Sequence, residues 1–105
     1  MKISELLEEG KKSYENMNYK DAIIYLETAL EIDENNYEAI TLIAEVYSRA
    51  DLYKEAIKYY EKAYKISPDD LLVLFSMGYL YQLINKPKKA IFYYKEYLGY
   101  EESYH

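Results

Sequence analysis

The side chains in this sequence that could carry out acid–base chemistry are carboxylates that occur in adjacent pairs. The pairs are Glu8 with Glu9, Asp33 with Glu34, Asp69 with Asp70, and Glu101 with Glu102. General acid–base catalysis needs a pair of carboxylates, or a histidine, held in a pocket closed to water. Each pair falls instead at an expected helix end or exposed turn, where acids are typical of solvated or capping charges. The single histidine is the last residue, so we predict no catalytic residues and no enzyme.

The sequence also lacks the residue patterns that usually bind a metal or a cofactor. The chain has no cysteine, which excludes a disulfide framework and a thiolate metal site. The stretch DENN, residues 33–36, lacks the alternating oxygen ligands and the glycine of a calcium-binding loop. With three glycines in all, there is no glycine-rich loop that could hold a phosphate. We therefore predict no metal and no cofactor.

The charge of the chain argues against nucleic acid as a partner. The formal net charge is −6, divided as −5 in residues 1–36, −2 in residues 37–70 and +1 in residues 71–105. Nucleic-acid affinity comes largely from lysine and arginine, so an acidic chain is a poor phosphate binder. The one basic cluster, Lys86, Lys88 and Lys89, surrounds Pro87 and is typical of a solvated turn. The acidic first two thirds favour a partner with basic residues.

Neither the first residues nor the longest uncharged run of the chain suggests a membrane protein. The first residues, MKISELLEEGKK, carry acids where a signal peptide needs an apolar core. The longest uncharged run extends from Leu71 to Ile84 and is shorter than the roughly 20 residues of a membrane span. We expect a cytoplasmic protein with no membrane partner.

An internal period of 34 residues organises the whole chain. The residues that recur at this interval are Ala22, Ala56 and Ala90; the small residues Gly10, Ala44 and Gly78; and Tyr25, Tyr59 and Tyr93. Such a period is typical of a repeat architecture. It predicts three units, about residues 3–36, 37–70 and 71–104, within a single domain of residues 1–105.

Each unit has the apolar pattern of two helices. In the second unit, Ile40, Ile43 and Tyr47 share one helical face, and Ala56 and Tyr60 share another after a turn. Because two helices approach closely only where side chains are small, we expect the small residues of each pair to meet at the crossing. Gly99 is expected to end the last helix in the left-handed conformation.

With three copies in register, the chain resembles the tetratricopeptide repeat family along essentially its whole length. The second unit matches the family pattern best, through Ile40, Ile43, Ala44, Tyr47, Ala56, Tyr60, Ala63 and Pro68. The resemblance implies an all-α fold, a right-handed superhelical solenoid of three antiparallel helix hairpins. It also implies a scaffold that binds protein partners.

The sequence departs from the family pattern near both ends. Glu9 and Ser13 stand where leucine and tyrosine are usual, which predicts a first helix that is partly frayed or shifted. Tyr97 replaces the small alanine that in this family faces the next repeat, so we expect the array to end there. The residues LGYEESYH, or a partner, would then cover the last hairpin.

The resemblance also places the binding surface, because the first helix of each family repeat lines a concave groove. The positions that correspond to this groove include Leu7, Lys11, Glu38, Leu42, Glu45, Arg49, Leu72, Phe75, Tyr79 and Leu83. We predict that a peptide or helix of a partner docks there. Leu42, Leu72, Phe75 and Tyr79 would be its apolar anchors, with the charged positions setting polarity.

Two further hypotheses concern this surface. Some family members clamp the carboxylate of chaperone tails, but the clamp positions here hold Leu7, Lys11, Leu42, Leu72 and Ser76, and only Lys11 offers a positively charged donor. That function is therefore not expected. The alternative to peptide binding is self-assembly, in which copies stack or dimerise through Phe92, Leu98 and Tyr100 of the last hairpin. A further alternative is that the carboxy-terminal tail or a second copy covers the apolar stripe of the third unit, Leu72, Phe75, Tyr79 and Leu83.

Overall fold

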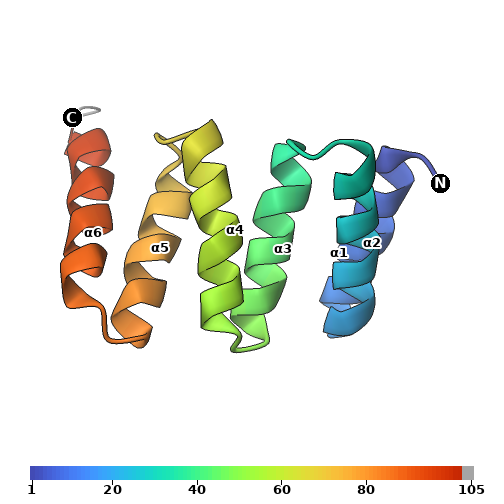
Figure 1. Ribbon diagram of the computed structural model, residues 1–105, viewed down its shortest axis with the longest axis horizontal. Coiled ribbons are helices and arrows are strands. Elements are labelled where there is room, and N and C mark those ends of the chain that lie inside the picture. Colours follow the sequence, from blue (N-terminus) through green and yellow to red (C-terminus); the bar gives the residue numbers. More distant parts are fainter. Residues whose placement is uncertain (103–105) are drawn as a thin grey trace.

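The part of the chain that is described consists of six helices. The computed structural model describes the backbone of residues 1–102 and the side chains of residues 1–99. The helices are α1 (Ile3–Glu15), α2 (Tyr19–Ile32), α3 (Tyr37–Arg49), α4 (Tyr53–Ile66), α5 (Leu71–Leu83) and α6 (Pro87–Glu102). Figure 1 shows successive helices running antiparallel from the amino-terminal end at the right to the carboxy-terminal end at the left. The fold is an all-α helical solenoid.

The helices pair as the 34-residue period predicts. The first helices of the three hairpins begin at Ile3, Tyr37 and Leu71, which are 34 residues apart. The predicted end of the third unit, about residue 104, lies outside the described residues. The expectation of a frayed first helix is wrong, because α1 runs without a break and the Lys2 backbone N–H donates to Glu5 Oε1 at 3.0 Å. This capping bond stabilises the first turn of α1.

The three hairpin turns repeat one backbone geometry. Met17, Asp51 and Asn85, again 34 residues apart, have positive φ of 63°, 63° and 60°. After each of them the next backbone N–H returns to the last turn of the preceding helix, as in the 2.9 Å bond from Leu52 to the Tyr47 carbonyl. This is the Schellman closure, in which a left-handed residue satisfies the free carbonyls of a helix end. Aspartate and asparagine tolerate that conformation better than most residues do.

Small residues allow close contact between the two helices of each hairpin. A Cβ atom added to Gly10 would lie 2.7 Å from Leu26 Cδ2, and one added to Gly78 would lie 2.7 Å from the Tyr94 ring. In the middle hairpin Ala44 and Ala56 are both fully buried in one cluster. In the first and third hairpins the small residue of the first helix thus faces a large side chain, Leu26 or Tyr94, so the prediction that small residues meet each other at these crossings is wrong.

One predicted helix end is wrong. Gly99 lies inside α6, which continues to Glu102, and no described glycine has a positive φ. Glycine permits the left-handed conformation without requiring it. Nothing lies within 4 Å of a Cβ built on Gly99, so no close contact explains a glycine at this position.

Candidate protein-interaction groove

The ten predicted groove residues all lie on the first helices of the hairpins. Leu7 and Lys11 are on α1, residues Glu38 to Arg49 of the set are on α3, and the remainder are on α5. Leu7, Leu42 and Glu45 are half-buried, and the other seven are exposed. Leu7 and Leu42 also pack against the buried cluster around Leu26. Both leucines therefore stabilise the fold in addition to facing the groove.

An ion pair connects α1 to α3 on this side of the groove. Lys11 Nζ donates to Glu38 Oε1 at 3.0 Å, and each side chain is 48 % exposed. A pair this exposed contributes at most about 1 kcal/mol to stability. Lys11, the one cationic side chain at the chaperone-clamp positions, is thus already paired with Glu38 of the neighbouring helix.

Tyr14 of α1, which is not one of the ten predicted groove residues, lies between α1 and α3. The Arg49 guanidinium lies 5.9 Å from the centroid of the Tyr14 ring. Burial raises the pKa of the Tyr14 hydroxyl, and the Glu45 charge raises it further, while Arg49 acts in the opposite direction. Tyr14 therefore connects α1 to the acidic and basic side chains of α3.

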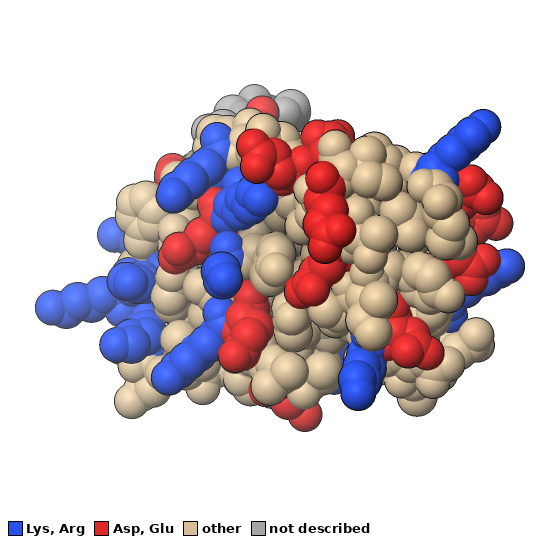
Figure 2. All heavy atoms as spheres, turned by 45° about the vertical axis from the view of Figure 1, so that its right-hand side comes forward, with Lys and Arg blue, Asp and Glu red and all other residues tan. Residues whose placement is uncertain are grey.

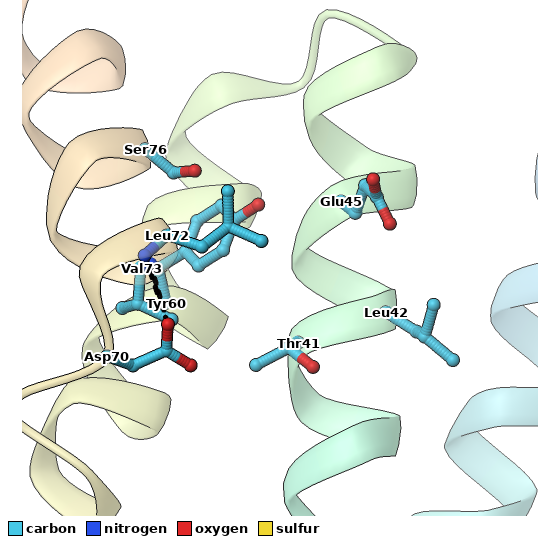
Figure 3. Close-up of a pocket in the computed structure, with 8 residues that line it drawn as sticks. All are labelled: Thr41, Leu42, Glu45, Tyr60, Asp70, Leu72, Val73 and Ser76. Carbon is cyan, nitrogen blue, oxygen red and sulfur yellow. Dashed lines mark hydrogen bonds between the residues drawn. The ribbon is translucent and has the colours of Figure 1, made fainter.

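A pocket of about 160 Å³ opens between α3 and α5. Its lining residues, drawn in Figure 3, are Thr41, Leu42, Glu45, Tyr60, Asp70, Leu72, Val73 and Ser76. Leu42, Glu45 and Leu72 of the predicted site are brought together here. The Tyr60 ring comes from α4, behind the two helices, and only 7 % of the residue is exposed.

Asp70 holds the pocket together at the start of α5. One carboxylate oxygen accepts from the backbone N–H groups of Leu72 and Val73 at 3.0 and 3.4 Å, and the other accepts from the Tyr37 hydroxyl at 2.6 Å. The same aspartate thus caps α5 and binds the first turn of α3.

Sequence reasoning missed three lining residues of this pocket. Tyr60 was predicted only as core, and the position of Asp70 between two units suggested only a turn. Val73 was not singled out. The 34-residue period could have indicated Tyr60, because the second helix of a hairpin packs behind the first helices of two successive units.

The predicted apolar anchors of the third unit form an exposed stripe on α5. We call Leu72, Phe75, Tyr79 and Leu83 the α5 stripe, and their exposed fractions are 73, 48, 50 and 43 %. The ring centroid of Phe75 lies 5.5 Å from that of Tyr97 and 5.9 Å from that of Tyr94. Tyr97 therefore folds back onto α5, where the small residue of the family pattern would leave a gap. Tyr100 and the tail predicted to cover the stripe lie outside the side chains that are described.

Charged side chains are unevenly distributed over the surface. Figure 2 shows lysine and arginine crowded at the left of the view, toward the carboxy-terminal helices, and acidic side chains running through its middle. This agrees with the change of net charge along the sequence. None of the described helices has the length and apolar character needed to cross a membrane.

Helix pairs repeated at a fixed interval, with a groove between their first helices, define a helical-repeat protein-interaction scaffold. The chain belongs to the tetratricopeptide repeat family. A family model described as tetratricopeptide repeat matches residues 36–100, and a second model of the same description matches residues 14–36. Proteins of this family bind protein partners, and their repeats typically act by binding and not by catalysis.

Solved structures of MamA have the same fold. A crystal structure of MamA superposes with a TM-score of 0.92 at 24 % identity, covering 97 % of this chain and 60 % of that one. A MamA RS-1 double mutant gives 0.90 at 18 % identity, covering 96 and 57 %. This chain therefore spans less than two thirds of those proteins, and at such identities the likeness concerns the fold alone. No curated protein matches the chain by sequence.

Proposed function

We propose that this protein docks a segment of a partner protein, as a peptide or helix, into the groove formed by α1, α3 and α5. The observation that carries the proposal is the α5 stripe, four large apolar side chains that are each 43 to 73 % exposed beside a preformed pocket. Exposed apolar side chains in such a row are typical of interaction surfaces. Covering one stripe of this kind typically gives micromolar binding, on the order of −8 kcal/mol.

The charges around the stripe support a partner with basic as well as apolar residues. Glu45 and Asp70 line the pocket next to Leu72, and none of the pocket's eight lining residues is basic. Electrostatic complementarity of this kind mainly sets specificity and the rate of association. An acidic partner segment would be repelled at the same place.

The test is a comparison of two folded double variants in capture from a cell lysate. Leu72→Lys with Tyr79→Lys alters the α5 stripe and leaves the buried clusters intact, because both residues are at least half exposed. The matched control, Ile24→Lys with Ile32→Lys, places the same charges on exposed positions of α2. We expect the control to retain the captured partner and the stripe variant to lose it, with a fragment of that partner binding the wild type in calorimetry. Equal capture by the two variants would contradict the proposal.

A second candidate function, self-assembly through α6, rests on a different observation. Ile57 of α4 is 7 % exposed beneath α5, whereas its counterpart one period later, Ile91, is 53 % exposed. Phe92 and Leu98 on the same helix are also about half exposed, at 51 and 52 %. Sedimentation over a range of concentrations tests this candidate. A mass that doubles in the wild type but not in Phe92→Lys with Leu98→Lys would support it, and a constant monomer mass would exclude it.

A further inference from the structure

The pocket between α3 and α5 combines an apolar lining with polar groups at its rim. Leu72 of α5, Tyr60 of α4 and Leu42 of α3 give it apolar lining, and Figure 3 shows Leu72 and Tyr60 on the α5 side of the space. The hydroxyl groups of Thr41 and Ser76 also border the space. A side chain that fits such a lining has an apolar stem and a polar end.

Neither of the two acidic residues that line the pocket, Glu45 and Asp70, belongs to an ion pair among the described residues. In the part of the chain that is described, the salt bridges join Lys11 to Glu38 and Lys12 to Glu9. Arg49, one turn further along α3, instead lies over the Tyr14 ring. Glu45 is half-buried as a residue and belongs to neither salt bridge. A carboxylate that no cation neutralises attracts a positively charged side chain.

Asp70 contributes less to the negative electrostatic potential at the pocket than a carboxylate without hydrogen-bond partners would. Its carboxylate is engaged by the amino terminus of α5 and by Tyr37, and the partial positive charge of that helix end offsets it. Burial raises the pKa of the Tyr60 hydroxyl, and the charges of Glu45 and Asp70 raise it further, opposed by Arg49. Both carboxylates are thus close enough to act on the pocket, with Glu45 the one free to pair.

We propose that this pocket receives a lysine or arginine side chain of the docked segment, with the stem against Leu72 and Tyr60 and the charged end at Glu45. The inference rests on the proposed groove function and names the residue that this groove selects. Lysine and arginine are the side chains that bury a long apolar stem while presenting a cation. An apolar side chain of equal length would remove water from Glu45 without pairing its charge, which is unfavourable. A metal ion is a poorer occupant, because no group of three possible metal ligands occurs among the described residues.

The first experiment selects peptides from a phage-displayed library of random 12-residue sequences on three proteins. They are the wild type, Glu45→Gln and Glu31→Gln. Glutamine has nearly the shape of glutamate, so Glu45→Gln removes the charge with little change of shape. Glu31→Gln is the matched control, since it removes an exposed carboxylate on α2, outside the pocket and outside the predicted groove positions.

The expected result is a motif of apolar residues with one basic residue at a fixed spacing from them. The basic position should persist with Glu31→Gln and disappear with Glu45→Gln, while the apolar positions remain in all three. An apolar motif with no fixed basic position on the wild type would overturn the pocket assignment and leave the groove function standing. If no motif emerges on the wild type, the groove function itself fails and the pocket assignment fails with it.

A second measurement gives the size of the effect. The best wild-type peptide is compared by calorimetry with the same peptide carrying norleucine, an uncharged side chain of similar length, at the basic position. Hydrogen bonds to charged groups are typically worth about 10- to 100-fold in binding. We expect a loss of about tenfold or more with the wild type and less than threefold with Glu45→Gln. Equal losses with both proteins would show that the basic residue binds elsewhere.

Discussion

At the scale of single residues, side-chain size determines how closely the two helices of a hairpin can pack. The crossing holds glycine in the first and third hairpins and alanine in the middle one. The glycines face Leu26 and Tyr94 so closely that an added Cβ would lie 2.7 Å from either side chain. Leu26 is fully buried, whereas Tyr94 is only partly buried and its hydroxyl donates to Gln82 at 3.0 Å. The first crossing therefore has less freedom to adjust than the third.

The space around Gly10 and around Gly99 predicts opposite effects of substitution by alanine. Gly10→Ala should lower the free energy of unfolding by up to about 2 kcal/mol, because overpacking costs about 1–3 kcal/mol and helix propensity returns about 1. Gly99→Ala, in open space within α6, should raise it by up to about 1 kcal/mol. Urea denaturation followed by circular dichroism measures both. A Gly10→Ala protein as stable as the wild type would show that Leu26 can move aside.

At the scale of helices, successive units are joined by side chains that serve two helices at once. Asp70 caps α5 and accepts from Tyr37 at the start of α3. Tyr64 of α4 donates to Glu96 Oε1 of α6 at 2.9 Å, and Tyr81 of α5 donates to Glu61 of α4. In all three contacts a tyrosine hydroxyl on one helix meets a carboxylate on another element. Part of the high tyrosine content therefore holds the units in register.

Asp70 offers a test of this connection. Asp70→Ala should cost about 1–3 kcal/mol of stability, since it removes a helix cap and leaves the partly buried Tyr37 hydroxyl without its acceptor. Asp70→Asn should cost clearly less, because asparagine caps a helix as well as aspartate does. The midpoints of thermal or urea unfolding compare the two. Equal losses would mean that the charge of Asp70, and not its hydrogen bonds, stabilises this junction.

At the scale of the whole molecule, the two ends of the row differ in polarity. Ala39, Ile43 and Val46 of α3 are buried against the first hairpin. The residues at the same positions of α1, one period earlier, are Glu5, Glu9 and Lys12. Another copy could not bury an apolar helix against these side chains. Self-assembly, if it occurs, should therefore join α6 to α6 and give a closed dimer rather than an end-to-end fibre.

Stability should also fall at alkaline pH. Burial raises the pKa of several tyrosines above the usual value of about 10, and hydrogen bonds to Asp70 and Glu61 raise the pKa of Tyr37 and Tyr81 further. Above about pH 10 the unfolded chain loses tyrosine protons that the folded chain retains, so folding binds protons and is weakened as pH rises. Below that pH the contribution is complete.

The measurement is the urea midpoint between pH 8 and pH 11.5. The wild type should lose stability from about pH 10 upward, and Tyr37→Phe should lose less over the same range. Lysine titration is common to the two proteins, so their difference isolates Tyr37. Parallel curves for the two proteins would rule out the contribution of this tyrosine.

The sequence by itself determined the six helices, the hairpins and the small residues at their crossings, because all of these follow from local apolar periodicity and a 34-residue repeat. The same register placed the first helix of each unit, and the resemblance to the tetratricopeptide family then indicated the ten candidate groove residues on these helices. Only the tertiary structure decided that Tyr60 and Asp70 line the groove pocket, that Lys11 pairs with Glu38, and that Tyr97 turns back onto Phe75. These contacts join residues on different helices, so they depend on interhelical distance and side-chain direction, which no local pattern encodes. Gly99 shows the same limit, since glycine permits a helix to end and the surrounding structure decides whether it does.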